Sequence, residues 1–524
     1  MPLALIAGIA AAALAFVYVL SQIREALRHR ARAKELGCKP AVWMSGYDPT
    51  GIADVLYGVA AGHKKQFPTY VQENLEREAI KNGRPVGTLC VRTPLFRDTL
   101  VTTDPQNIQT ILALKFKDFG LGVNRTDNFQ PLLGHGIFAT NGKQWERSRA
   151  LLRPQFIRGQ VSNLSLEEDH VKALMTVLDR RVGLDGWTDL VDLQPLFFRL
   201  TLDSATEFLF GESVNSQLDE GQPGSDKDAS FSYAFDKAQY TLSVGARLGP
   251  HYWMIQVPEF HRMVKRVHDF VDYFVQKALT QGASKKSLEN VNEEKYVFLN
   301  ALAKETRDPE ELRSQLLNIL LAGRDTTAST LGWFFYTMAD PRYASVFRRL
   351  RATILEEFGT YSNPKEITFE KMKSCQYLQW SLNECLRLYP AVPMNVRTAQ
   401  VDTTLPTGGG VDGQSPIYIR KGQDVSYAVY IMHRRKDIWG PDAEIFKPER
   451  WETRRPGWDY LPFNGGPRIC IGQQFALTEV GYVVIRMMQR IDSIDGSQVG
   501  PIMHGLTLTN CPGEGVNVKL HFAE

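Results

Sequence analysis

The feature that most constrains this chain of 524 residues is a short run near its carboxyl end, residues 463–472, Phe-Asn-Gly-Gly-Pro-Arg-Ile-Cys-Ile-Gly. It places Cys470 between two glycines, Gly466 and Gly472, with an arginine two residues before it. A strongly apolar segment with helical character follows at 475–488. The first N–H groups of a helix point outward and favour negative charge. A cysteine just before a helix is therefore expected to have a lowered pKa and to be kept as a thiolate.

A lone cysteine is usually a small buried hydrophobe or an inert thiol. Here the pattern Phe-x-x-Gly-x-Arg-x-Cys-x-Gly resembles the haem-binding signature of the cytochrome P450 superfamily. A thiolate can serve as an axial ligand of haem iron and favours O–O cleavage. The resemblance implies haem b (iron protoporphyrin IX) as the cofactor and Cys470 as the iron ligand. It also implies that Phe463 packs by the thiolate, that Arg468 binds a haem propionate, and that Gly472 lets the backbone approach the porphyrin.

The composition, 43% hydrophobic and 23% charged, is that of a globular protein with ample material for a core. Net charge is +3, so bulk charge gives no case for nucleic-acid binding. The six cysteines show no metal-ligand spacing, which favours free thiols in a reducing compartment. We predict a mainly α protein with small β-sheets, consistent with the P450 fold. The predicted helices are 144–152, 193–210, 260–279, 309–339 and 347–357, and the predicted strands are 95–103, 425–431, 506–510 and 516–522, the last two forming a terminal hairpin.

The amino terminus is the other strongly patterned segment. Residues 3–20 carry no charge, and 2–23 is about the 20 residues needed to cross a bilayer core. Five basic residues follow between Arg24 and Lys34, which by the positive-inside rule puts the body of the protein in the cytosol. A cleaved signal peptide is the alternative, but the apolar run is too long and has no basic residue before it. We predict a transmembrane anchor at 1–23, a basic juxtamembrane linker at 24–60 and a single catalytic domain at 61–524, held at the endoplasmic reticulum membrane by one span.

A second motif, residues 322–327 (Ala-Gly-Arg-Asp-Thr-Thr), places four polar side chains inside an apolar segment that spans 316–335. Polar groups in a buried helix need a reason. The plain alternative is a hydrogen bond from Thr326 to a carbonyl one turn earlier, with Asp325 solvated. The run resembles the oxygen-binding helix of the P450 family. The resemblance implies that the helix opens at Gly323 to make room for dioxygen, that Thr326 donates a hydrogen bond to the bound oxygen, and that Asp325 relays protons.

Glu384 and Arg387 lie three residues apart on one face of a predicted helix that looks buried, where a lone charge would be costly. They match the family's Glu-x-x-Arg pattern, and Arg450 would be the third member of the implied structural triad. His433 is interpreted as a packing or hydrogen-bonding residue of the region before Cys470.

Trp145 and Arg149 share a helix face and can both donate to carboxylates. The resemblance assigns them to a haem propionate. Arg397 is a further propionate candidate.

Finer features resemble the fungal branch of the family that hydroxylates alkanes and fatty acids: residues 36–40, 322–325, 405–410 and 415–417. The family implies pocket walls at the loop 116–133, at the helix face 316–326, at 391–396 and at 506–509, whose apolar content fits a hydrophobic substrate. Ala322 stands where animal fatty-acid ω-hydroxylases carry a glutamate, so neither their covalent haem ester nor their strict terminal selectivity is expected here. A relative that oxidises a polyketide or another secondary metabolite would look much the same.

The resemblance implies a monooxygenase that places one oxygen atom in a C–H bond. Its electrons would come from NADPH through a separate cytochrome P450 reductase, with cytochrome b5 as a second possible donor. A P450-like isomerase and a non-enzymatic haem carrier are the alternatives. Neither would need Asp325 and Thr326 in a distal helix.

Overall fold

A computed structural model describes residues 2–44, 50–93, 97–156, 164–218, 231–284 and 297–523. The chain divides into two compact units. The first comprises residues 1–57, 71–120 and 396–427, and the second comprises 58–70, 121–395 and 428–524. Two helices, α2 (Ile52–His63) and α3 (Phe67–Asn82), contribute residues to both units.

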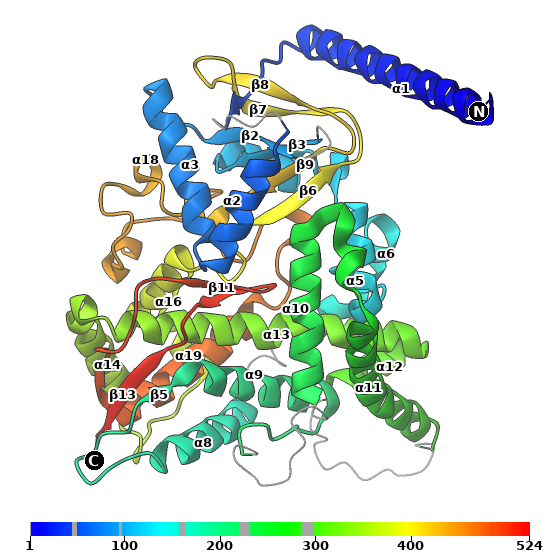
Figure 1. The fold of residues 1–524 in the computed structure, drawn as a ribbon. Helices are drawn as coiled ribbons and strands as arrows, with labels where there is room; N and C mark the ends of the chain where they lie inside the picture. The colour runs from blue at the N-terminus through cyan, green and yellow to red at the C-terminus, as the bar shows by residue number, and fades with distance from the viewer. Residues whose placement is uncertain are drawn as a thin grey trace. The chain divides into compact units, whose positions relative to one another are not determined.

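The first unit is built on a six-stranded mixed sheet in the order β1-β2-β3-β9-β6-β4 (Figure 1). Strands β2 (Thr88–Thr93) and β3 (Arg97–Thr102) form an antiparallel pair, and β9 (Asp424–Tyr427) joins β3 in parallel. The predicted strand 95–103 is confirmed over the residues of β3, while 95 and 96 lie outside the described residues. Other elements of this unit include β1 (Val42–Trp43), β4 (Phe119–Gly120), β6 (Asn395–Ala399), α4 (Pro105–Gln109) and the hairpin of β7 (Thr403–Gly409) and β8 (Ser415–Ile419).

The chain begins with α1 (Pro2–Glu35), which includes the basic run from Arg24 to Lys34. His29 Nδ1 lies 3.0 Å from the Tyr418 hydroxyl on β8. Within the part of the chain that the structure describes, no helix meets the combination of length and apolar character that a membrane span requires.

The second unit is mainly helical, and α13 (Pro309–Met338) runs through it (Figure 1). Asp308 caps this helix by accepting hydrogen bonds from the N–H groups of Glu310 and Glu311, and Pro309 occupies the first turn, where no N–H is needed. The other helices are α5 (Val123–Leu133), α6 (Gly142–Leu152), α8 (Ser165–Asp179), α9 (Leu193–Phe210), α10 (Phe231–Leu248), α11 (Pro258–Ser284), α12 (Phe298–Glu305), α14 (Ala344–Phe358), α15 (Phe369–Ser374), α16 (Gln376–Leu388), α17 (Val429–Met432), α18 (Lys436–Trp439) and α19 (Gln473–Arg490). The predicted helices are confirmed as α6, α9, α11, α13 and α14, and the apolar segment after Cys470 as α19.

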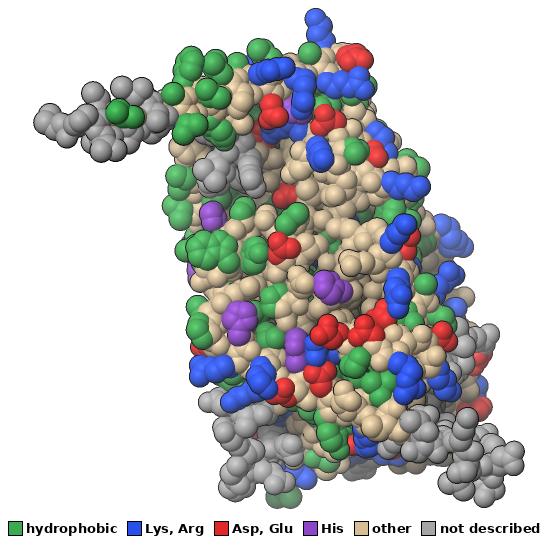
Figure 2. All heavy atoms as spheres, turned by 90° about the vertical axis from the view of Figure 1, so that its right-hand side faces the viewer, with side chains coloured by type: hydrophobic (Ala, Val, Ile, Leu, Met, Phe, Trp, Pro, Cys, Tyr) green, Lys and Arg blue, Asp and Glu red, His purple; other side chains and the backbone are tan. Residues whose placement is uncertain are grey.

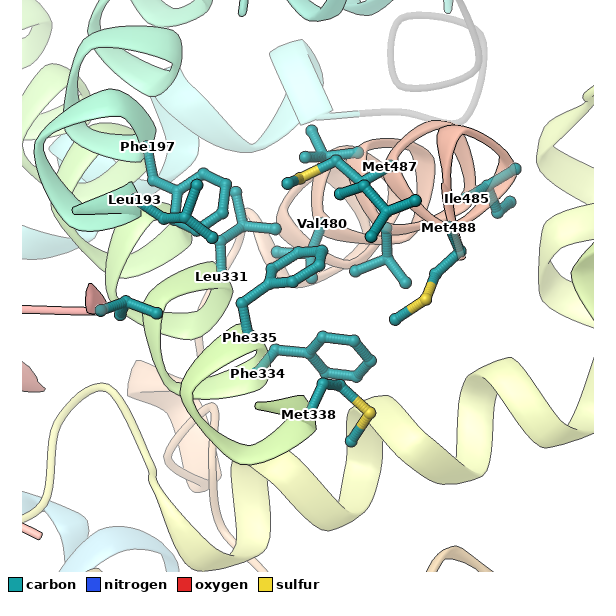
Figure 3. Close-up of a cluster of buried hydrophobic side chains, with 14 of the residues drawn as sticks. Leu193, Phe197, Leu331, Phe334, Phe335, Met338, Val480, Ile485, Met487 and Met488 are labelled. Carbon is teal, nitrogen blue, oxygen red and sulfur yellow. The ribbon is translucent and has the colours of Figure 1, made fainter. Parts of the chain in front are cut away.

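The core of this unit lies where α9, α13 and α19 meet (Figure 3). The labelled side chains in that view come from all three helices and pack against one another: Leu193, Phe197, Leu331, Phe334, Phe335, Met338, Val480, Ile485, Met487 and Met488. Most of them are completely buried, and burial of each such side chain stabilises the fold by about 1.5–3 kcal/mol. This packing fixes α13 against α19, the helix that follows Cys470.

Two strand predictions are wrong in part. The predicted strand 425–431 ends at Tyr427, because residues 429–432 form the single-turn helix α17. An uninterrupted apolar run that is buried on every side has no period that separates a strand from a helix. The predicted terminal hairpin is also wrong. β11 (His504–Leu506) pairs with β12 (Asn510–Pro512), whereas β13 (Asn517–Phe522) joins β10 (Ile491–Asp495) and β5 (Val191–Asp192).

The segment 116–133 is not the loop that we predicted, since residues 123–133 form α5. Pro131 lies inside this helix and weakened the helical pattern in the sequence. On the face drawn in Figure 2, acidic and basic side chains are interspersed, and its described residues form no continuous basic stripe.

Candidate functional site

The segment around Cys470 forms a tight loop just before α19. The Cys470 N–H donates to the Phe463 carbonyl at 3.0 Å, which closes the loop. A short 3-10 turn, η9 (Gly466–Arg468), lies within it, and Gly466 has a φ of +67°, a conformation that favours glycine. Gly472 caps α19. The sequence therefore places Cys470 just outside the first turn of a helix, as predicted.

The pKa of the Cys470 thiol is shifted in the direction opposite to the one expected from the sequence. Burial raises the pKa of Cys470, and the Gly472 N–H and the Arg149 guanidinium only partly offset this effect. The helix begins at Gln473, so the sulfur lies beyond the first turn, where the effect of the helix dipole falls off. A cation bound beside the sulfur, such as a metal centre, would favour the thiolate form.

Cys470 faces a cavity of about 760 Å³. The wall combines apolar surface with two guanidinium groups and is formed by Trp145, Arg149, Arg153, Pro154, Phe156, Gly466, Pro467, Ile469, Cys470 and Ile471. An added Cβ at Gly472 would approach the Phe156 ring to 3.6 Å, an ordinary contact, so close packing alone does not require a glycine there.

Trp145, Arg149 and Arg468 come together beside this cavity. The Arg468 guanidinium lies 4.4 Å from the centre of the Trp145 ring, and Arg149 lies 5.9 Å from it. Arg149 Nη1 donates to the Ile469 carbonyl at 2.9 Å, and Arg468 Nη2 donates to the Thr140 carbonyl at 3.1 Å. A thiol, two guanidiniums and apolar surface fit haem, which needs one soft axial ligand, cations for its propionates and cover for its rings.

On α13, Gly323 faces open space, because an added Cβ there would have no neighbour within 4 Å. Thr326 Oγ1 donates to the Ala322 carbonyl at 2.6 Å. This is the back-bond of the plain alternative, and α13 stays continuous through the motif. The room at Gly323 thus comes from the missing side chain and not from an opened helix.

Asp325 is buried, with an exposed fraction of 3%, so the other half of the plain alternative is wrong. Its Oδ1 accepts a hydrogen bond from Arg324 Nη1 at 3.2 Å. Burial raises the pKa of Asp325 to about 6, against the opposing effect of Arg324. A carboxyl group that titrates near neutral pH can both release and take up protons under working conditions.

The three residues Glu384, Arg387 and Arg450 form one buried ionic cluster. Arg387 Nε and Nη2 bind the two oxygens of Glu384 at 2.9 and 2.8 Å, and Arg450 Nε approaches Glu384 Oε1 at 3.3 Å. The Trp451 indole donates to Glu384 Oε2 at 3.0 Å. Glu384 and Arg387 have no exposed surface, so each relies on the others for compensation of its charge.

Arg397 lies on β6 in the first unit, where its guanidinium is 5.6 Å from the centre of the Tyr427 ring. Its place at a propionate stays a prediction.

Hydrogen bonds tie the predicted pocket walls of the second unit to one another and to α13. Asn510 N donates to the Ala391 carbonyl at 2.9 Å, and the Asn510 carbonyl accepts from the Trp333 indole on α13 at 2.8 Å. Asn318 Nδ2 of α13 donates to the Leu133 carbonyl at the end of α5 at 2.9 Å. Residue 391 therefore contacts β12, β12 contacts α13 at Trp333, and α5 contacts α13 at Asn318.

Two contributors escaped sequence reasoning. Trp451 directly follows the predicted Arg450, yet nothing in the pattern showed that its indole points to Glu384. Asp236 on α10 bonds to Arg324 from another helix. An acid on an amphipathic helix looks like any solvated residue until the fold brings a partner to it.

Comparison with known proteins agrees with this geometry. The sequence model of the family Cytochrome P450 matches residues 27–515. Cytochrome P450 monooxygenase g430 of Fusarium sp is 50% identical over 513 residues, which cover 96% of this chain and 88% of that protein. Cytochrome P450 52A13 of Debaryomyces hansenii is 48% identical over 80% of this chain and 81% of its own length. Cytochrome P450 52A9 of Candida maltosa is 46% identical over 90% of each.

These matches cover the cysteine loop, α13 and the ionic cluster in a single alignment of nearly the whole chain. The family uses haem b with a thiolate ligand and takes electrons from a reductase. The chain belongs to the cytochrome P450 family and is a haem-dependent monooxygenase.

Proposed function

We propose that this monooxygenase hydroxylates a long alkyl chain, that of an alkane, a fatty acid or a fatty-acyl compound, at or near its end. The observation that carries the proposal is the open space at Gly323, next to Asp325 and Thr326 and directly after the apolar turn of residues 319–322 on α13. The resemblance of residues 36–40 and 405–417 to the alkane- and fatty-acid-hydroxylating branch supports the same substrate class.

Haem, when bound, supplies dioxygen activation and C–H oxidation. Cys470 would hold its iron, and Arg149 and Trp145 on the cavity wall, with Arg468 beside them, would hold its propionates. Phe463 and Gly472 would shape the loop around the sulfur. Arg397 is proposed as a further propionate partner.

Asp325 and Thr326 would supply protons to the reacting site. Thr326 would turn its hydroxyl from the Ala322 carbonyl toward the substrate side, because a hydroxyl is both donor and acceptor. Asp325, with its pKa raised by burial to about 6, would hold a proton near neutral pH and recover it from solvent through water.

We further propose that residues 1–23 anchor the protein by one span in the endoplasmic reticulum membrane, with the catalytic domain, 61–524, in the cytosol. The support is the uncharged run 3–20 followed by the basic residues 24–34. Deletion of residues 1–35 should then move the protein from the membrane pellet to the supernatant. A deleted form that still pellets completely would show that another surface holds it.

Electrons would come from NADPH through cytochrome P450 reductase, with cytochrome b5 as a possible second donor. No flavin or nicotinamide motif is evident in the sequence.

A second candidate function is oxidation of a polyketide or another secondary metabolite. Ala322 stands where the ω-hydroxylases with a covalent haem ester carry a glutamate. The relatives from Fusarium sp and Alternaria solani are named only as monooxygenases.

Titration of the ferric holoenzyme with fatty acids and alkanes of graded chain length separates these functions. A low-spin to high-spin shift of the Soret band, with an optimum at one chain length, is expected for a lipid-chain hydroxylase. Absence of a shift with every chain would contradict the lipid proposal and favour a dedicated biosynthetic substrate.

A further inference from the structure

Arg324 joins two acids from two different helices. Its Nη1 donates to Asp325 Oδ1 on the same helix at 3.2 Å, and the same nitrogen bonds to Asp236 Oδ1 on α10. The Arg324 side chain is only 5% exposed, whereas the Asp236 side chain is 54% exposed. One buried guanidinium thus connects the buried carboxyl group of Asp325 to an acid at the surface.

The rest of this environment holds Arg324 in place. Its guanidinium lies 5.1 Å from the ring centre of Phe198 on α9 and 5.9 Å from that of Phe235 on α10. A guanidinium packed against two rings has little freedom to leave, and cation–π contacts of this kind contribute about 0.5–2 kcal/mol each. The fold therefore holds the guanidinium that lies between Asp236 and Asp325.

The other titratable groups near Asp325 come from neighbouring elements. Cys511 on β12 has its pKa raised to about 12 by burial and, to a smaller extent, by the charge of Asp325. Glu479 on α19 lies beside Thr327, and burial raises its pKa to about 7. On α10, Gln239 favours the ionised form of Asp325, as Arg324 does. Among these groups, Asp236 is the carboxylate that opposes Arg324 directly.

We propose that Asp236 is a positioning residue for proton delivery, which competes with Asp325 for Arg324 and so keeps Asp325 able to carry a proton. This inference rests on the proposed role of Asp325. One nitrogen of Arg324 serves both acids, so Asp325 shares with Asp236 the positive charge that stabilises its carboxylate. The proton that Asp325 releases toward the reaction site is replaced by one from solvent water, so the carboxyl group returns to its starting state.

The charges of Asp236 and Arg324 also support a role for Asp236 in keeping Asp325 protonated. Burial and the negative charge of Asp236 both raise the pKa of Asp325, while Arg324 lowers it. Without the Asp236 charge, Arg324 would pair with Asp325 alone and stabilise its carboxylate. The protonated fraction of Asp325 at a given pH would then fall.

The test is Asp236→Asn in the haem-loaded enzyme, reconstituted with reductase and NADPH. Coupling, the ratio of hydroxylated product to NADPH consumed, is measured across pH 5 to 8. The alkaline limb of the coupling profile should move down by about one pH unit, as expected for loss of a neighbouring like charge, and the solvent isotope effect at pH 7.5 should rise. The substrate-induced spin shift should stay as in the unchanged enzyme, because the Asp236 side chain is more than half exposed at the surface.

Two controls sharpen this test. Asp236→Glu keeps the charge and should restore the profile. Asp269→Asn on α11 removes an exposed acid that pairs with Lys265 and should leave the profile in place. Asp236 is more than half exposed, so its amide variant should fold. If it nevertheless loses haem, Asp236→Ser replaces it, with the same shift expected.

An unchanged profile and isotope effect in the Asp236 variant would overturn the inference. Failure of the proposed function gives a different result. In that case Asp325→Asn would leave coupling intact, or the unchanged enzyme would consume no dioxygen with NADPH. The two failures are therefore distinguishable in one series.

Discussion

His433 links the ionic cluster to the cysteine loop through Leu461. The Leu461 N–H donates to His433 Nε2 at 2.9 Å, and His433 Nδ1 lies 3.0 Å from the Arg387 carbonyl. This arrangement requires a neutral ring with its proton on Nδ1. Burial and the nearby charge of Arg387 hold the pKa of His433 well below its usual range, which agrees with a neutral ring. A chain of hydrogen bonds therefore runs from the Glu384 cluster through His433 to Leu461, two residues before Phe463.

Replacement of His433 by Phe should loosen the cysteine loop. An aromatic ring is kept, but the buried Leu461 N–H loses its acceptor, at a cost of about 1–3 kcal/mol. We expect haem to leave at lower urea concentration, with near-native secondary structure in its absence. Haem release followed by absorbance checks this, and His251→Phe at an exposed position serves as the control. Equal haem retention in the two variants would argue against the link.

Glu384→Gln should prevent haem incorporation. The substitution leaves the guanidinium of Arg387 buried without its carboxylate, which costs about 3–5 kcal/mol. Haem content per polypeptide after expression is the measurement. A Glu384→Gln variant that folds, binds haem and keeps normal stability would show that the cluster is not essential.

Thr326→Ala should uncouple oxygen use from hydroxylation, so that NADPH is consumed while peroxide is released. Thr330 provides a matched control one turn along α13, because its hydroxyl makes the same kind of back-bond, to the Thr326 carbonyl at 2.8 Å. Thr330→Ala should keep normal coupling. If peroxide release stays low in both variants, Thr326 has no part in the relay.

Stability should fall as the medium becomes acidic, in part through His504. Burial lowers the pKa of His504 to about 4, while its unfolded value is 6.5. The unfolded chain therefore binds more protons below pH 6.5, and stability is lost as pH falls from 6.5 toward 4, by up to about 3 kcal/mol. His504→Gln should flatten this part of the pH dependence, measured as the urea midpoint at each pH. An identical slope in the variant would assign the acid sensitivity elsewhere.

The elements predicted correctly from the sequence are those whose start and end are marked by residues within or next to the element itself. Helix α9 begins and ends at the predicted residues, because Asp192 caps its start and Gly211 adopts a left-handed conformation at its end. The cysteine loop and the Glu384–Arg387 pair were predicted from short patterns, and their geometry agrees with those patterns.

The rest depends on contacts between distant parts of the chain. Strand β13 pairs with β10 and with β5, which lies more than 300 residues earlier in the chain. The turn at 512–515 is a local signal, and it wrongly indicated a hairpin with the strand just before it. The pKa of Cys470 was predicted with the wrong sign because the sequence shows the helix but not the burial around the sulfur. The link from Arg324 to Asp236 required the fold of α10 over α13.

The most direct test of the account is turnover of a fatty acid under isotopically labelled dioxygen, with reductase and NADPH present. The account predicts one labelled oxygen atom in the hydroxylated product and the other in water, with no product from Cys470→Ala. Product that forms without dioxygen or reductase, or that carries no label, would contradict a monooxygenase built on Cys470, Asp325 and Thr326.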